Sequence, residues 1–146
     1  IDDYQFERIW NDHYPYIERL REFTCALTPD FSLYMDMPMA IKIWNVYRSR
    51  LIGQMMQDAD IVVISTLSWA EPETFSFCFE MLEQGGVVAV STVGVMRNKS
   101  AQEVWAAGMN EAGQRLRPSG ILCYGSKPDY DFGSLPVRFV GARKFG

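Results

Sequence analysis

The chain is poor in the residues that most catalytic and metal sites require. Its 146 residues include one histidine, His13, and three cysteines, Cys25, Cys78 and Cys123. His13 lies in a polar stretch far from any nucleophile-like serine or cysteine, so a Ser-His-Asp or Cys-His triad is not expected. The cysteines are odd in number, widely spaced and set among apolar residues, which indicates core side chains and not a disulfide framework or metal ligands. We therefore predict a reducing, cytoplasmic setting.

Long apolar runs and an excess of positive charge are missing too. No stretch approaches the roughly 20 apolar residues of a membrane helix, and no signal peptide pattern is present, so we expect a soluble protein with no membrane partner. A net charge of −4 and a pI near 5.0 argue against non-specific attraction to nucleic acid, although a local basic patch could still bind it. The sequence also contains no glycine-rich phosphate loop or dinucleotide fingerprint.

What the chain does have is a repeated alternation of strand and helix patterns. Four apolar runs of strand length end in small hydroxyl or turn residues and lead into helix-like segments; they span residues 25–33, 61–69, 87–94 and 121–126. This alternation predicts an α/β fold with a parallel sheet of repeated βα units. Either a three-layer or a partial-barrel-like arrangement would satisfy it.

The two ends of the chain carry further expectations. Residues 1–4 read like the end of a strand that runs into a turn, so we expect an N-terminal strand to be missing. Residues 127–146 are rich in glycine, proline and charge, which predicts an irregular segment with a short strand at 137–140 and a basic surface tail, Arg143 and Lys144. We expect residues 1–146 to form a single domain.

The longest predicted helix spans residues 38–58 and carries an arginine on its apolar face. At 100° per residue Arg48 falls in the middle of an apolar stripe, while Arg50 points away from it. The stripe consists of Ile41, Trp44, Leu51, Ile52 and Met55. A buried guanidinium without a partner costs roughly 3 to 5 kcal/mol. Arg48 is therefore either a structural ion pair or snorkelling residue, or an arginine that binds a ligand anion.

Polar residues at the predicted strand ends form the candidate site, because ligands gather at the carboxyl ends of parallel strands. We assign Asp30 and Arg48 as catalytic candidates. The substrate-binding candidates are Ser32, Thr66, Trp69, Thr92 and Tyr124. Hydroxyls and helix N-termini suit phosphate or carboxylate groups. The alternative is that these serines and threonines only cap helices and satisfy turns.

A cofactor is left open by the sequence. Mg²⁺ needs only oxygen ligands, so a carboxylate site is a weaker hypothesis. Its ligands would come from Asp2, Asp3, Asp30 and Asp36. Acidic residues at turns are common, and histidine or cysteine clusters of metal-ligand spacing are absent, so no metal ligand is assigned.

Several short motifs of the sequence are similar to those of one family. They are DYQFERIW at 3–10, TPDFSLY at 28–34, MP at 37–38, WNVYRSR at 44–50, Trp69, FCF at 77–79, VSTVG at 90–94 and YG at 124–125. Together they resemble the domain of unknown function family 4417, over almost the whole chain. The resemblance implies an uncharacterised domain of bacteria, phages and mobile elements, with no activity to transfer. The resemblance also implies a glycine, usual in members, in the loop after the Phe-Cys-Phe motif, where this chain has residues 80–83. This departure leaves the role of that loop open.

Two hypotheses about function follow. The first is an enzyme acting on a phosphorylated, nucleotide-like or nucleic-acid substrate, in which Arg48 holds an anion, Asp30 is the acid, base or metal ligand, and Trp69 and Tyr124 wall the pocket. A shifted acid that converges with Arg48 in a concave site would favour it. The second is a non-catalytic protein- or nucleic-acid-binding module, in which Arg48 and Asp30 form a structural pair. The oligomeric state is left open.

Overall fold

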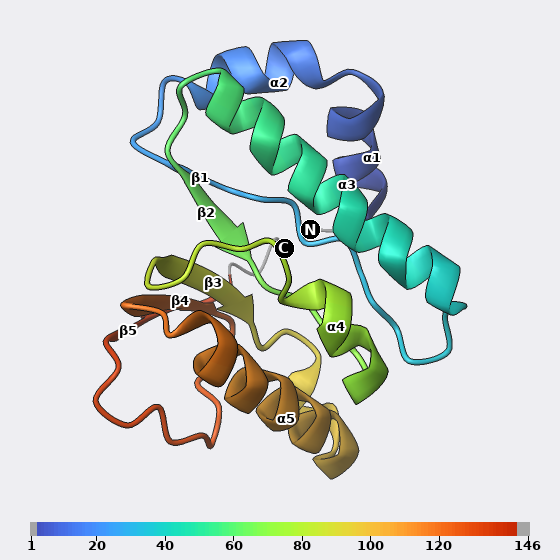
Figure 1. Cartoon of the computed structure of the whole chain (residues 1–146), viewed down its shortest axis with the longest axis vertical. Coiled ribbons are helices and arrows are strands. Elements are labelled where there is room, and N and C mark those ends of the chain that lie inside the picture. The colour runs from blue at the N-terminus through green and yellow to red at the C-terminus, as the bar shows by residue number, and fades with distance from the viewer. Residues whose placement is uncertain (1–2, 143–146) are drawn as a thin grey trace.

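The computed structural model describes residues 3–142 and shows an open, five-stranded parallel sheet (Figure 1). The strands are β1 (Ala26–Leu27), β2 (Val63–Thr66), β3 (Val87–Ser91), β4 (Gly120–Tyr124) and β5 (Val137–Val140). They lie in the sheet in the order of the sequence, and each pairs in parallel with the next. The predicted α/β class and parallel sheet of βα units are confirmed.

The helices that follow β1 connect neighbouring strands on one side of this sheet, and the first two helices precede β1. The helices are α1 (Asp3–Asn11), α2 (His13–Leu20), α3 (Met39–Asp58), α4 (Phe75–Cys78) and α5 (Lys99–Leu116), with 3₁₀ turns η1 (Pro72–Thr74) and η2 (Val95–Arg97). Right-handed crossovers between sequential parallel strands place their helices on the same face. Figure 1 shows α3, α4 and α5 together in front of the sheet. The sheet is open and is not closed into a barrel.

Two apolar clusters join the helices to that face. Under α4 and α5 the inward residues of β3 and β4 are Val88, Val90, Ile121 and Cys123, and they pack against α5 residues such as Trp105. The second cluster joins β1 and β2 to α2 and α3, with members Ile17, Ala26, Phe31, Ile52, Met56 and Ile61. Alternate strand residues point to the same face, so each strand contributes every second side chain to these clusters.

The opposite face of the sheet has no helix over it in the described part of the chain. Several side chains on that face are exposed, namely Leu27 by 47%, Val87 by 45%, Val140 by 45% and Tyr124 by 39%, whereas Ala89 in the middle of β3 is only 4% exposed. Parallel sheets are ordinarily covered on both faces. This face is therefore unusually open for a parallel sheet.

The predictions for individual segments were correct in some places and wrong in others. Asp3 and Tyr4 open α1 and are not the end of a strand, while residues 1–2 and 143–146, with the predicted basic tail, lie outside the described residues. The predicted strand at 25–33 shrinks to two residues, because Pro29 has no N–H to continue the ladder. The short strand at 137–140 is confirmed as β5. Among the described helices, none is long and apolar enough to cross a membrane.

Candidate functional site

Asp30 and Ser68 meet at the carboxyl ends of β1 and β2. The Ser68 hydroxyl donates a hydrogen bond to the Asp30 carboxylate. Burial raises the pKa of the Asp30 carboxyl, and the negative charge of Asp3 raises it further, while the Ser68 hydrogen bond opposes both effects. The pair combines a hydroxyl with a carboxyl that holds its proton to higher pH than an exposed aspartate.

Arg48 is held by a different carboxylate. Its side chain is only 8% exposed, and its guanidinium forms an ion pair with Glu7 of α1. A second nitrogen donates to Asn45 Oδ1 at 2.7 Å, and the guanidinium carbon lies 3.9 Å from the centre of the Phe31 ring. Nε has no hydrogen-bond partner within the described residues. Arg48 is thus tied to α1 and to the loop after β1, which fits the structural ion pair and not the pairing with Asp30.

Ser32 and Thr66 are both occupied by local hydrogen bonds. Ser32 donates from its hydroxyl at 3.0 Å and from its backbone N–H at 3.1 Å to the Asp3 carboxylate. The Thr66 hydroxyl donates to the Thr28 carbonyl at 2.9 Å, and the Thr66 N–H donates to Thr28 Oγ1 at 2.9 Å. These contacts fasten α1 to the loop after β1, and β1 to β2.

Trp69 is a packing residue beneath α5. Its indole N–H donates to the Val104 carbonyl at 3.1 Å, and its ring lies 6.1 Å from that of Trp105. The indole occupies the space that a Cβ at Gly108 would fill. The absence of a side chain at Gly108 therefore lets Trp69 lie directly on the helix backbone, where it does not wall a pocket.

Thr92 and Tyr124 lie at the ends of β3 and β4, and neither shares a cavity with Asp30. Thr92 is 2% exposed, and its hydroxyl donates to the Ser126 carbonyl at 2.6 Å. Tyr124 is on the helix-free face of the sheet. Two open grooves in the described part of the chain, one along α1 and α2 and one between α2 and α3, are lined by other residues. The sequence-predicted residues are therefore not gathered into one concave site.

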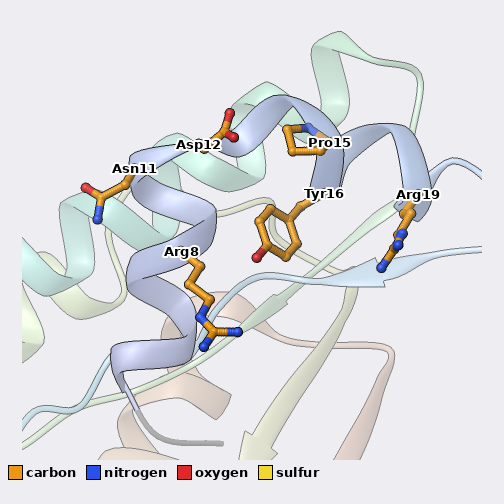
Figure 2. A pocket seen from close by; sticks show the side chains of 6 residues that line it. All are labelled: Arg8, Asn11, Asp12, Pro15, Tyr16 and Arg19. Carbon is orange, nitrogen blue, oxygen red and sulfur yellow. The ribbon is translucent and has the colours of Figure 1, made fainter.

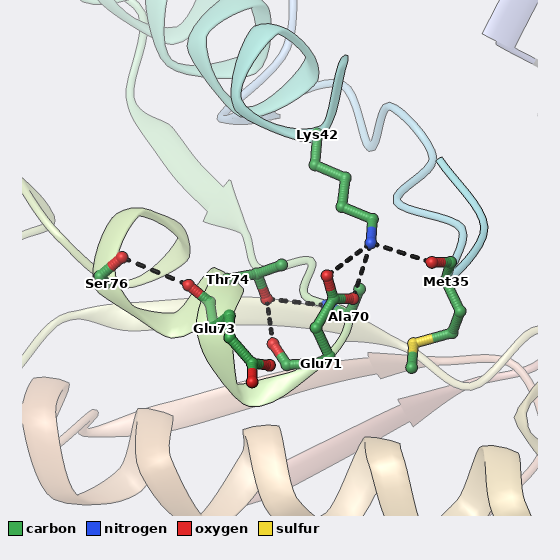
Figure 3. A network of polar contacts seen from close by, with 7 residues as sticks. All are labelled: Met35, Lys42, Ala70, Glu71, Glu73, Thr74 and Ser76. Atoms are coloured by element: carbon green, nitrogen blue, oxygen red, sulfur yellow. Dashed lines mark hydrogen bonds and ion pairs between the residues drawn. The ribbon is translucent and has the colours of Figure 1, made fainter. Parts of the chain in front are cut away.

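The first half of α3 buries polar residues, and Figure 3 shows one of them, Lys42, reaching Glu71 and Met35. Lys42, with a side chain 2% exposed, donates to both Glu71 carboxylate oxygens at 2.6 and 2.7 Å and to the Met35 carbonyl at 3.1 Å. The Lys42 hydrogen bond lowers the pKa of the Glu71 carboxyl. Further along, Asn45 donates to the Ser32 carbonyl at 2.7 Å, and Ser49 Oγ donates to the Pro29 carbonyl at 2.6 Å. This inner face of α3 clamps the loops that follow β1 and β2.

The outward side of the same half-helix is apolar. Ile43 is 48% exposed, Trp44 44% and Tyr47 51%. The rings of Trp44 and Tyr47 stack with centroids 5.6 Å apart, and Trp10 of α1 meets Trp44 edge to face at 5.4 Å. The predicted inward stripe was wrong for Ile41 and Trp44, which are exposed, and Arg50 does not point to solvent but donates to the Cys78 carbonyl at 2.5 Å.

A groove of about 490 Å³ lies between α1 and α2 (Figure 2). Arg8, Tyr16 and Arg19 point to the same side of the two helices, while Asp12 points away from them. The lining is completed by Asn11 and Pro15. The two guanidinium groups and the phenol of this groove can donate hydrogen bonds, and the Asp12 carboxylate in its lining can accept them.

A comparison with known families decides where the chain belongs. The family model described as Domain of unknown function (DUF4417) matches residues 1–140. The chain belongs to the DUF4417 family. Two phage proteins, both called Gene 1 protein, are 42% identical to it over 136 residues, which is 93% of this chain; they come from Mycobacterium phage L5 and Mycobacterium phage D29.

The DUF4417 domain described here is shorter than these relatives. The matched part covers 59% of the phage L5 protein and 50% of the phage D29 protein. No solved structure matches the chain significantly. Family membership therefore supports a phage connection, and it supplies no reaction, ligand or partner.

The DUF4417 domain has functional candidates that sequence reasoning missed. Glu7 pairs with the buried Arg48, and Glu71 pairs with the buried Lys42. Glu7, Lys42 and Glu71 were not assigned a role. A signal was present in the sequence: Lys42, Asn45 and Ser49 recur at helical spacing, so they form a polar stripe next to the apolar one. In residues 3–142 no group of three or more histidine, cysteine, aspartate or glutamate side chains is placed to hold a metal ion.

Proposed function

We propose that this DUF4417 domain is a non-catalytic protein-binding module of a phage-type protein. Its docking surface is the outer face of α3, defined as Ala40, Ile43, Trp44, Tyr47 and Leu51. The observation that carries the proposal is the inverted polarity of α3, with a buried lysine and arginine on one side and half-exposed aromatic residues on the other. Contiguous exposed apolar surface of this kind marks interaction sites.

The composition of the outer face supports a protein partner. Tryptophan and tyrosine dominate the energetic centres of protein interfaces, because they bury large rigid surfaces at little cost in side-chain entropy. Trp44 and Tyr47 are already stacked on each other and braced by Trp10. A partner would therefore meet a preorganised surface.

The strand ends support catalysis less well. The raised pKa of Asp30 is the shift expected of a catalytic acid, but Arg48 is turned to Glu7, and neither residue lines a described groove. An arginine whose charge is already neutralised and stacked on Phe31 has little left for a substrate anion. Arg48 is best explained as the anchor between α3 and α1.

The proposal is tested by placing a photo-cross-linking residue at Ile43 and, as a control, at Glu103 on the exposed side of α5. We expect a protein adduct from position 43 only, identified by mass spectrometry, re-formed from the purified components, and lost when Trp44→Ser is added. Equal adducts from both positions, or none from position 43, would contradict the proposal. Each variant is first checked for an unchanged circular dichroism spectrum.

The second candidate function is an enzyme that acts on a phosphorylated or nucleotide-like substrate. The Asp30–Ser68 pair is the observation that favours it. This candidate is tested by a thermal-shift screen against nucleotides, phosphorylated metabolites, short oligonucleotides and Mg²⁺, because a ligand that binds the folded state raises the melting temperature. Stabilisation lost in Asp30→Asn and Ser68→Ala would support it. Stabilisation lost only in Arg8→Ala would assign the anion to the groove between α1 and α2.

A further inference from the structure

The outer face of α3 has the spacing of a helix-pairing seam. Ala40, Trp44, Tyr47 and Leu51 recur at intervals of four, three and four residues. A 4-3-4 repeat keeps side chains on one line of an α-helix and is the pattern by which two helices pack along their length. Ala40, Trp44 and Tyr47 are exposed and Leu51 is half-buried. The partner that fits this seam is another helix.

No charged side chain interrupts the seam. The segment from residue 40 to residue 51 contains three charged residues, Lys42, Arg48 and Arg50. Lys42 is bonded to Glu71, Arg48 to Glu7, and Arg50 to the Cys78 carbonyl. A strongly acidic or basic partner would therefore find no counter-charge here, whereas an apolar helix needs none. Two copies of this face could approach each other without burying like charges.

We infer that the helix that docks here is α3 of a second copy, packed antiparallel about a two-fold axis between Trp44 and Tyr47. The inference rests on the proposed function and names its partner. In this register Ala40 of each copy meets Leu51 of the other, and Trp44 meets Tyr47. A small residue opposite a large one lets the helices interdigitate, and the two aromatic pairs form the centre. The patch is self-complementary, as a two-fold interface requires.

The area is adequate for such a dimer. Trp44 and Tyr47 each expose about half of the ~200 Å² that a large aromatic side chain offers. With Ile43, Ala40 and the flanking Trp10 the face approaches the ~500 Å² per copy that corresponds to a ~1,000 Å² interface, the lower bound for a specific association. The dimer is therefore expected to be reversible, and to dissociate on dilution.

Engineered cysteines test both the partner and its direction. In a Cys25→Ser background, in which Cys78 and Cys123 are buried, we would introduce Ala40→Cys and Leu51→Cys together and singly. Eleven residues of helix separate the two positions by ~16 Å, beyond the ~7 Å limit of a disulfide, so any disulfide must join two copies. We expect disulfide dimers from the double variant and none from either single variant. Dimers from Ala40→Cys alone would overturn the antiparallel arrangement.

Analytical ultracentrifugation provides the independent measurement. Tyr47→Lys should weaken self-association at least ~10-fold, as loss of a central aromatic residue does. Tyr14→Lys is the matched control, because Tyr14 is 70% exposed on α2 and lies outside the seam, and it should leave the association unchanged. Equal effects of the two substitutions would overturn the inference.

Failure of the inference is separable from failure of the proposed function. If the wild-type chain stays monomeric and the cross-linker at Ile43 captures a different protein, the inference that the partner is a second copy is wrong. The proposal that the outer face of α3 is a docking surface then still holds. If the cross-linker captures nothing and the chain is monomeric, both proposals fail. An adduct of twice the mass of the chain supports both.

Discussion

The first half of α3 and the helix α5 bury opposite kinds of residue. α5 turns Trp105 and Met109 inward onto β3 and β4 and leaves Lys99 and Glu103 in solvent. Its sequence pattern is that of an ordinary amphipathic helix, because the surface beneath it consists of apolar strand side chains. For α5, inside and outside can be assigned from hydrophobicity alone.

The first half of α3 obeys the same physics over a different surface. It does not cover the apolar face of the strands but the loops that leave their carboxyl ends, where the backbone carbonyls of Pro29, Ser32 and Met35 need donors. Polar side chains are the better neighbours for such groups, since an unpaired buried carbonyl is costly. The comparison teaches that a polar helix face can be the inner one when the helix covers loops.

The largest effect is expected in the conventional helix. Trp105→Ala should lower the free energy of unfolding by roughly 3 to 5 kcal/mol, because it empties the core and removes the hydrogen bond from the indole to the Ser91 carbonyl. Urea denaturation measures this, with exposed Glu103→Ala as a control within ~0.5 kcal/mol. A loss below ~1 kcal/mol for Trp105→Ala would mean that α5 is not the core helix.

The inverted helix should respond asymmetrically to loss of either partner of its buried pair. Glu71→Gln leaves the Lys42 ammonium buried without a counter-charge and should cost about 3 kcal/mol. Lys42→Met should cost clearly less, because the Glu71 side chain is 22% exposed and can turn to water. Urea denaturation of the two variants measures which substitution lowers the stability more. A larger loss for Lys42→Met would show that the lysine stem, and not its charge, holds α3.

At the strand ends, Asp30 should make the stability of the fold depend on pH. Because the folded pKa of Asp30 is raised above its ordinary value of 3.8, the folded state holds the proton more tightly than the unfolded state. The stability that this group contributes is fully present below pH 3.8 and is lost as pH rises through the raised value. Asp30→Asn should flatten that decline. An unchanged slope of stability against pH would contradict the assignment.

The smallest effect is expected on the outer face of α3. Ile43→Gln should change the free energy of unfolding by no more than ~0.5 kcal/mol when the chain is dilute enough to be monomeric, since Ile43 is 48% exposed and outside both apolar clusters. Thermal melts at several protein concentrations provide the measurement. A loss comparable to that of Trp105→Ala would show that the face is structural.

The fold was largely predictable because it depends on local patterns. The β-branched runs around β2, β3 and β4 are short, continuous and bounded by turn residues. β2 and β3 fall inside the predicted ranges, and β4 begins one residue before its range. The helix at 38–58 agrees with α3 to within one residue. Hydrophobic periodicity and the positions of turn residues in the sequence are sufficient to predict such elements.

The candidate site was harder to predict because its contacts are distant in sequence. Glu7, the partner of Arg48, lies 41 residues away on a helix whose start was interpreted as the end of a strand. Trp69 looked like a pocket wall, and only the approach of Gly108 makes it a core residue. The raised pKa of Asp30 depends on burial, which composition and spacing do not reveal.

The placement of the four tryptophans has an optical consequence. Trp69 and Trp105 lie in the apolar cluster beneath α5, whereas Trp10 and Trp44 lie together at the outer face of α3. Each region thus contains its own pair of fluorophores. An aqueous quencher such as iodide should extinguish the emission of the half-exposed Trp44 well before that of the core pair. Shielding from the quencher on association would then report occupancy of the α3 surface without any added label.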